Sequence, residues 1–200
     1  MKLQEKQLYH FYNQGNNGRQ LFYTRENYYY FLRHFQKFVF PYCEVVCYCL
    51  MPNHFHFLLS TNETSMQKVK VGSLEISALK NGFRLLLSAY TKGINRQQNF
   101  KGSLFRQKTK VKLLENSDRN YPFTCFHYIH QNPLKAKLVE KMEDWEYSSF
   151  QDYLGTRNET ICHKDLAYDL LGITKDRFYK ESYEVISSDT LQKVITDEMR

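Results

Sequence analysis

Apolar and polar positions repeat with two different periods along the first 114 residues. Short apolar and aromatic runs predict strands over 7–12, 43–51, 54–60 and 102–114. Apolar residues three or four positions apart predict helices over 25–39 and about 66–94, the second weakened near Asn81-Gly82. Met51-Pro52-Asn53 has the chemistry of a turn, so the second and third strands should form a hairpin.

The remaining chain adds helices to this pattern. A helix is predicted from Tyr121 to Asn132, ending before Pro133, and residues from 161 onward look helical. The polar stretch after Gly155 marks a boundary, which divides the chain into domains 1–154 and 155–200. We expect an α+β fold: a ferredoxin-like β-α-β-β-α-β core with an antiparallel sheet, followed by a tyrosine-bearing helix and a C-terminal helical extension.

Composition places the chain among globular proteins. It has 200 residues, of which 42% are hydrophobic and 24% charged. The five cysteines are odd in number, and we expect them to be reduced thiols in an intracellular protein. We expect neither a secretory signal nor a membrane span, because no long apolar run occurs.

Positive charge is concentrated in the middle of the chain. The net charge is +7, and residues 68–112 carry eleven Lys or Arg against one acid, Glu75. Such a run can be a solvated helix face and edge strand, or a surface that binds phosphate backbones. Alternation along the last predicted strand puts Lys108, Lys110 and Lys112 on one face.

Two histidines flank one apolar residue at the start of the third strand. Side chains two positions apart on a strand share a face, so His54 and His56 should lie side by side. Neutral imidazoles in this arrangement can bind one divalent metal, although most such pairs are surface or core residues. Cys43, Cys47 and Cys49 lie just upstream, but their spacing matches no common zinc pattern, and buried thiols act as small hydrophobic groups.

A second candidate pair lies on the predicted helix before Pro133. Tyr128 and Asn132 are four residues apart and therefore share a helix face. The Asn132 amide could supply an oxygen ligand to a cation beside Tyr128. The chain has sixteen tyrosines, and from the residues alone an ordinary core tyrosine is the favoured interpretation.

Five segments carry a family pattern in order. They are Tyr12–Asn17, Leu50–His56, Gly102–Gln107, Tyr128–Val139 and Asp144–Phe150. Together they resemble the single-tyrosine HUH transposases, most closely the REP-associated tyrosine transposases of bacteria. The Met-Pro-Asn-His-x-His and Tyr-x-x-x-Asn-Pro pieces are the most specific, and the resemblance spans about residues 7–154.

The resemblance implies a site and a reaction. His54, His56 and Asn132 would hold a divalent metal, Mg²⁺ or Mn²⁺, and Tyr128 would be the nucleophile of an HUH catalytic domain at 1–154. Members of this family cut single-stranded DNA next to a hairpin through a 5′-phosphotyrosine and transfer the strand. Lys135 and Lys137 stand where Arg and Gly are common. His130 is an unusual neighbour for the nucleophile; we expect it on the surface, the alternative being that it competes for the metal.

The expected partner is a single-stranded DNA hairpin, in the bacterial cytoplasm and at the nucleoid when bound. The residues expected to contact it are Arg84, Arg106, Lys108, Lys110 and Lys112. A homodimer is possible, because some relatives exchange the tyrosine helix between subunits. The alternative is a catalytically silent or domesticated protein that binds hairpin DNA or RNA; a replication initiator or relaxase would usually be longer.

Overall fold

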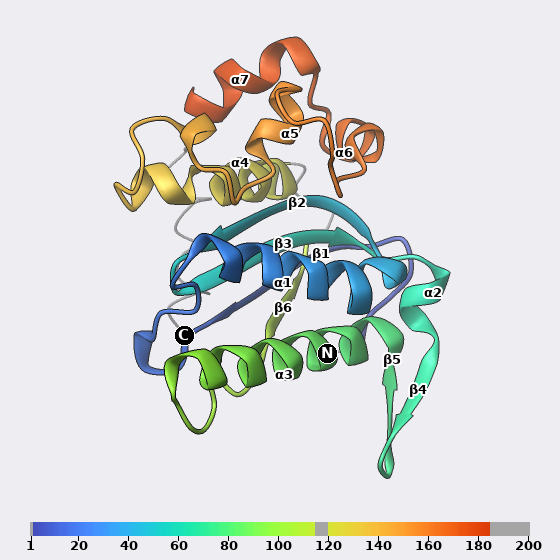
Figure 1. The fold of residues 1–200 in the computed structure, drawn as a ribbon. Helices are drawn as coiled ribbons and strands as arrows, with labels where there is room; N and C mark the ends of the chain where they lie inside the picture. Colours follow the sequence, from blue (N-terminus) through green and yellow to red (C-terminus); the bar gives the residue numbers. More distant parts are fainter. Residues whose placement is uncertain (1, 115–119, 185–200) are drawn as a thin grey trace.

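A four-stranded antiparallel sheet lies between two layers of helices in this computed structural model, which describes residues 2–114 and 120–184 (Figure 1). The sheet order is β2-β3-β1-β6. Its strands are β1 (Leu8–Gln14), β2 (Glu44–Met51), β3 (His54–Ser60) and β6 (Lys110–Leu113). Helices α1 (Arg25–Phe38) and α3 (Ala78–Gln98) cover one face, and α4 (Asn120–Lys135) packs on β2 from the other. The predicted ferredoxin-like core is confirmed.

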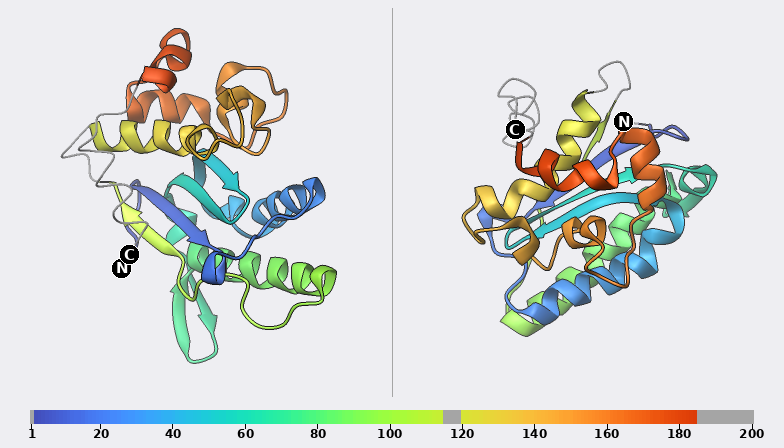
Figure 2. Two further views of the ribbon diagram at one scale, coloured as in Figure 1. Left: turned by 90° about the vertical axis from the view of Figure 1, so that its left-hand side faces the viewer. Right: turned by 90° about the horizontal axis from the view of Figure 1, so that it is seen from above.

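The other elements are shorter. They are α2 (Glu63–Met66), β4 (Lys68–Val71), β5 (Leu74–Ser77), α5 (Phe150–Leu154), α6 (Lys164–Leu171), α7 (Lys175–Glu184) and the 3₁₀ turns η1 (Asn16–Gly18), η2 (Phe40–Tyr42) and η3 (Met142–Asp144). The extension predicted over 155–200 is described as far as residue 184. Its helix α7 contacts α4 and α5 on the side of α4 away from the sheet (Figure 2).

Alternation along β3 decides which side chains enter the core. Phe55 and Phe57 face α1 and α3, and Phe57 stacks on Phe35 of α1 with ring centroids 4.2 Å apart. His54 and His56 therefore face the opposite side of the sheet, since successive strand residues point to opposite faces. The register that buries the phenylalanines also fixes the position of the histidine pair.

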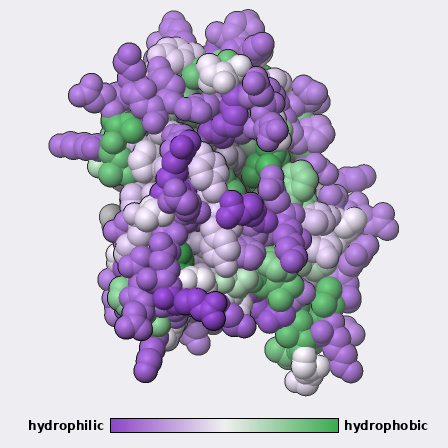
Figure 3. All heavy atoms as spheres, in the orientation of Figure 1, coloured by the Kyte–Doolittle hydropathy of each residue, from purple (hydrophilic) through white to green (hydrophobic). Residues whose placement is uncertain are grey.

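The prediction of one long helix from about residue 66 is wrong in its first part. Residues 68–77 form the β4–β5 hairpin, and helix α3 begins only at Ala78. Val69 and Val71 alternate with lysines and pair with Ile76 and Leu74 across a two-residue turn that starts at Gly72, whose φ is +61°. On the face of Figure 3, hydrophobic side chains gather over this hairpin, where Leu74 is 67% exposed.

Two further predicted boundaries differ from the structure. The last strand was predicted over 102–114, but only Lys110–Leu113 pair fully with β1; Phe105 makes a single isolated bridge to Gly15 before them. Helix α4 continues past Pro133 to Lys135. A proline has no backbone N–H, so the helix passes position 133 without the backbone bond that another residue would donate there.

The sequence predicted a weak point in helix α3 near Gly82, but the helix is continuous there. Gly82 instead determines how closely α3 approaches α1. A Cβ atom at this position would lie 2.2 Å from the carbonyl oxygen of Phe38. In an exposed helix, Gly→Ala stabilises by about 1 kcal/mol. Here we expect Gly82→Ala to destabilise the protein by about 1–3 kcal/mol because the helices must separate. Chemical denaturation measures the effect; a more stable variant would contradict this packing.

All five cysteines are buried, and none is paired in a disulfide in the structure. Burial raises the pKa of the Cys47 thiol well above its usual value, so the thiol stays protonated. Among the helices in 2–114 and 120–184, none combines the length and the apolar character that crossing a bilayer requires.

Candidate active site

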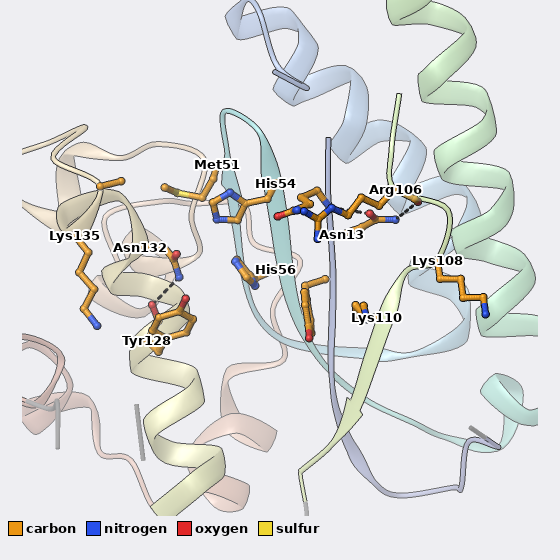
Figure 4. A pocket seen from close by; sticks show the side chains of 13 residues that line it. Asn13, Met51, His54, His56, Arg106, Lys108, Lys110, Tyr128, Asn132 and Lys135 are labelled. Atoms are coloured by element: carbon orange, nitrogen blue, oxygen red, sulfur yellow. Dashed lines mark hydrogen bonds between the residues drawn. The ribbon is translucent and has the colours of Figure 1, made fainter. Parts of the chain in front are cut away.

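A cleft of about 690 Å³ opens between α4 and the uncovered part of the sheet. Figure 4 shows side chains from α4 on one side of it, His54 and His56 of β3 in the middle, and the segment before β6 on the other side. The lining residues are Tyr12, Asn13, Gln14, Met51, His54, His56, Arg106, Lys108, Lys110, Tyr128, Asn132, Lys135 and Ala136. Segments more than 100 residues apart in the sequence therefore meet here.

The histidine pair lies side by side, as the strand pattern predicts. The rings of His54 and His56 are 4.9 Å apart between centroids. His54 Nδ1 is 2.7 Å from Asn53 Oδ1, and His56 Nδ1 is 2.9 Å from His10 Nε2. In both residues the δ nitrogen is held within the protein, so the ε nitrogen is the atom that a cation would take.

Burial keeps both members of the His10–His56 pair neutral. His56 is 1% exposed, and desolvation lowers its pKa to about 3. The pKa of His10 is also well below its usual value, mainly because of desolvation, and the neighbouring His56 and Lys112 disfavour a positive charge there as well. Because its pKa is so low, His56 is neutral at neutral pH, and the neutral imidazole is the form that binds a metal.

Tyr128 and Asn132 share the face of α4 that lines the cleft. The Tyr128 ring packs edge-on against His56, with centroids 6.1 Å apart. Asn132 Nδ2 donates to the backbone carbonyl of Tyr128 at 2.9 Å (Figure 4). Because the amide nitrogen donates this bond, the amide oxygen of Asn132 is the atom that could act as a ligand to a cation.

The predicted basic residues divide between two sides of the sheet. Arg106, Lys108 and Lys110 line the cleft. Lys112 pairs with His10 across the ladder and lies over the Tyr121 ring, its Nζ 4.6 Å from the centroid, so it shares their face without lining the cleft. Arg84 of α3 lies on the other side, where it bonds to Asn81, and is not part of this site.

The residues that meet in the cleft fit a divalent cation. Two imidazole nitrogens and one amide oxygen are a donor set that can hold a divalent metal ion, with water completing the shell. In the parts of the chain that the structure describes, no group of three or more His, Cys, Asp or Glu side chains is placed to hold a metal. The upstream cysteines thus form no zinc site.

His130 is not on the surface, contrary to the expectation. It is fully buried on the far side of α4, where Nε2 lies 2.8 Å from Ser149 Oγ. Phe126, Phe150 and Tyr153 surround its ring. Helical spacing explains the difference, since a residue two positions after Tyr128 points away from the cleft.

Comparison with known proteins supports one family. No family model matches the chain. A curated REP-associated tyrosine transposase of Haemophilus influenzae is 30% identical over 108 residues, which cover 54% of this chain and 58% of that protein. The chain is similar to the REP-associated tyrosine transposases. The resemblance predicted from the sequence is confirmed, and the match spans a little over half of the relative's length.

A solved structure shows the same fold. It is described as a REP-associated tyrosine transposase bound to a REP hairpin, and it matches with a TM-score of 0.53 at 15% identity. The match covers 78% of this chain and 84% of that chain. At this identity the likeness is one of architecture, in agreement with the ferredoxin-like sheet.

Sequence reasoning missed two residues that touch the residues of the candidate site. His10 forms a hydrogen bond to His56 and stacks on Tyr12. The only signal for it in the sequence was its place on the first strand, two residues before Tyr12. Lys135 lies over the ring of Tyr128, its Nζ 5.1 Å from the centroid. Its spacing of seven residues from Tyr128, about two helical turns, placed it on the same face.

Proposed function

We propose that this protein is a metal-dependent single-stranded DNA endonuclease and strand transferase, a transposase that acts next to DNA hairpins through a 5′-phosphotyrosine. The observation that carries the proposal is the contact between the Tyr128 ring and His56 in one basic cleft of a single chain. The likeness to REP-associated tyrosine transposases supports the choice of substrate.

The proposed reaction replaces one phosphate ester by another. The Tyr128 oxygen forms a bond to phosphorus, and the bond from phosphorus to the 3′ oxygen of the upstream nucleotide breaks. The phenol proton passes to solvent, and the departing oxygen takes up a proton to become a 3′ hydroxyl. The phosphotyrosine conserves the ester, so a second 3′ hydroxyl can reverse the step on another strand without ATP.

The chain's own residues would hold and orient the phosphate. His54, His56 and Asn132 would hold Mg²⁺ or Mn²⁺, which when bound neutralises the non-bridging oxygens of the phosphate. Lys135 stands over the Tyr128 ring, and Lys108 and Lys110 line the opposite wall. Among the described residues that line the cleft, none is acidic, so the wall attracts a polyanion.

The polarity of the covalent product tests this proposal. A hairpin oligonucleotide with a single-stranded flank is labelled at its 3′ end or, separately, at its 5′ end, and is incubated with the protein and Mn²⁺. We expect the 3′ label to migrate with denatured protein and the 5′ label to be released on a fragment with a 3′ hydroxyl. Binding without any cleavage would support instead the catalytically silent hairpin-binding protein.

His10 is expected to act as a positioning residue for His56. Phenylalanine at this position keeps a ring beside Tyr12 and His56 but removes the nitrogen bonded to His56 Nδ1. We expect His10→Phe to weaken Mn²⁺ binding about 10- to 100-fold, measured by calorimetry without DNA. His10→Gln retains an acceptor and should recover part of the affinity. Equal Mn²⁺ affinity in His10→Phe and wild type would remove this role.

A further inference from the structure

A second groove lies on the opposite face of the sheet from the cleft, at the same edge. It has a volume of about 480 Å³ and runs between α3 and the segment that leads into β6. Its rim carries Lys80, Arg84 and Arg106, and its floor includes Phe83, Leu87 and Phe105. None of the described residues that line it is acidic.

Arg106 joins the groove to the cleft. It lines both, and its backbone N–H donates to the carbonyl of Gln14 at the end of β1, at 2.9 Å. Strand β6 is the last strand of the sheet order, so within 2–114 and 120–184 no further strand separates the two spaces at this edge. Asn13 of the cleft also donates to Thr109 of the groove at 3.1 Å. A flexible polyanion can therefore pass from one space to the other around the sheet edge.

The chemistry of the groove fits unpaired nucleotides. Guanidinium and ammonium groups on the rim suit phosphates, and an apolar floor suits contact with the exposed surfaces of unpaired bases. A duplex presents mainly its backbone and would leave such a floor unused. Phe83 and Phe105 are almost completely buried and support the floor from below, and the half-buried Leu87 and Val111 provide the apolar surface that a base meets.

We infer that this groove binds the single-stranded DNA that continues from the cleft, with Arg106 at the crossing point and with phosphates on Lys80 and Arg84. The inference rests on the proposed function for the identity of the strand in the cleft. It assigns to Arg84 a contact with the substrate distant from the reacting phosphate, and it explains why the basic segment occupies two faces of the sheet.

The test compares three double variants that each remove two positive charges. Lys80→Gln with Arg84→Gln alters the groove, and Lys108→Gln with Lys110→Gln alters the cleft. Lys92→Gln with Arg96→Gln is the matched control, because both residues are exposed on the same helix α3 and line neither space. Binding is measured by fluorescence anisotropy in EDTA, on a blunt hairpin and on the same hairpin with a flank of about 15 nucleotides.

We expect the flank to tighten binding to the wild-type protein about tenfold. The groove variant should lose this gain, and on the flanked hairpin its slope of log affinity against log salt should decrease by about 1.4 relative to wild type. The cleft variant should bind both DNAs more weakly, and the control should keep the gain from the flank.

Two results would overturn the inference. One is a groove variant that keeps the gain from the flank, as the control does; the other is a groove variant that weakens the blunt hairpin as much as the flanked one, which would place a duplex there. Because binding is measured without metal, the outcome is independent of cleavage. Loss of the flank gain without any covalent product in the labelling assay would retain the groove and reject the transposase chemistry.

Discussion

Replacing Tyr128 with phenylalanine is expected to lower covalent attachment to DNA by about a thousandfold or more. The substitution removes one hydroxyl and keeps the ring that packs against His56 and beneath Lys135. Tyr128 is only 6% exposed, so the retained ring should preserve folding and the shape of the cleft. Hairpin binding should stay within about threefold of wild type, because phosphate contacts with the basic wall are unchanged.

Tyr121→Phe is the matched control for this experiment. Tyr121 lies on the same helix, seven residues earlier, and lines no part of the cleft. We expect it to form the covalent product at the wild-type rate. Full adduct formation by Tyr128→Phe would show that another hydroxyl is the nucleophile.

The second large effect that we expect follows from removing the proposed metal site. His54→Ala should reduce adduct formation by about a hundredfold or more, because charge neutralisation at the phosphate contributes several kcal/mol. His54 is the better position to alter, since His56→Ala would leave the buried His10 ring without its bond to His56. Excess EDTA should have the same effect on wild type, and added Mn²⁺ should restore wild type but not the variant.

The control is a histidine on the opposite side of the sheet. His34 lies on α1, packs against Tyr30 and Phe38, and is remote from the cleft. His34→Gln should keep both the activity and its dependence on Mn²⁺. Undiminished adduct formation in excess EDTA would eliminate the metal from the mechanism.

The core of the fold could be predicted from the sequence because two periods alternate in it. Strands with phenylalanine at every second position, as in Phe55 and Phe57, and helices with aromatic residues at helical spacing bury the same layer. The order of these elements then determines a ferredoxin-like sheet. Nothing in this pattern depended on distant contacts.

The β4–β5 hairpin was missed because its signal is short. Alternating valine and lysine over 68–71, with a glycine next, is the pattern of a strand and turn. The apolar positions from Leu74 to Ala89 also fit a helix, and a local pattern does not say where one period gives way to the other. At the start of α3 the backbone N–H of Ala78 donates to the carbonyl of Gln67, a contact between residues eleven positions apart.

The candidate site was predictable only where local geometry decided it. Strand alternation placed His54 beside His56, and helical spacing placed Tyr128 beside Asn132. That the two pairs meet depends on how α4 packs against β2, which no local pattern specifies. Only the family resemblance implied it. The support of His56 by His10 could not be predicted, because it requires the register between β1 and β3.

The central claim is that Tyr128 becomes bonded to DNA, and mass spectrometry of the adduct tests it directly. Wild-type protein is trapped on the flanked hairpin, treated with nuclease and digested with trypsin, which should release the peptide Asn120–Lys135. This peptide contains two tyrosines, Tyr121 and Tyr128. We predict that fragmentation places the nucleotide on Tyr128; a nucleotide on Tyr121, or on a tyrosine of any other peptide, would contradict the account.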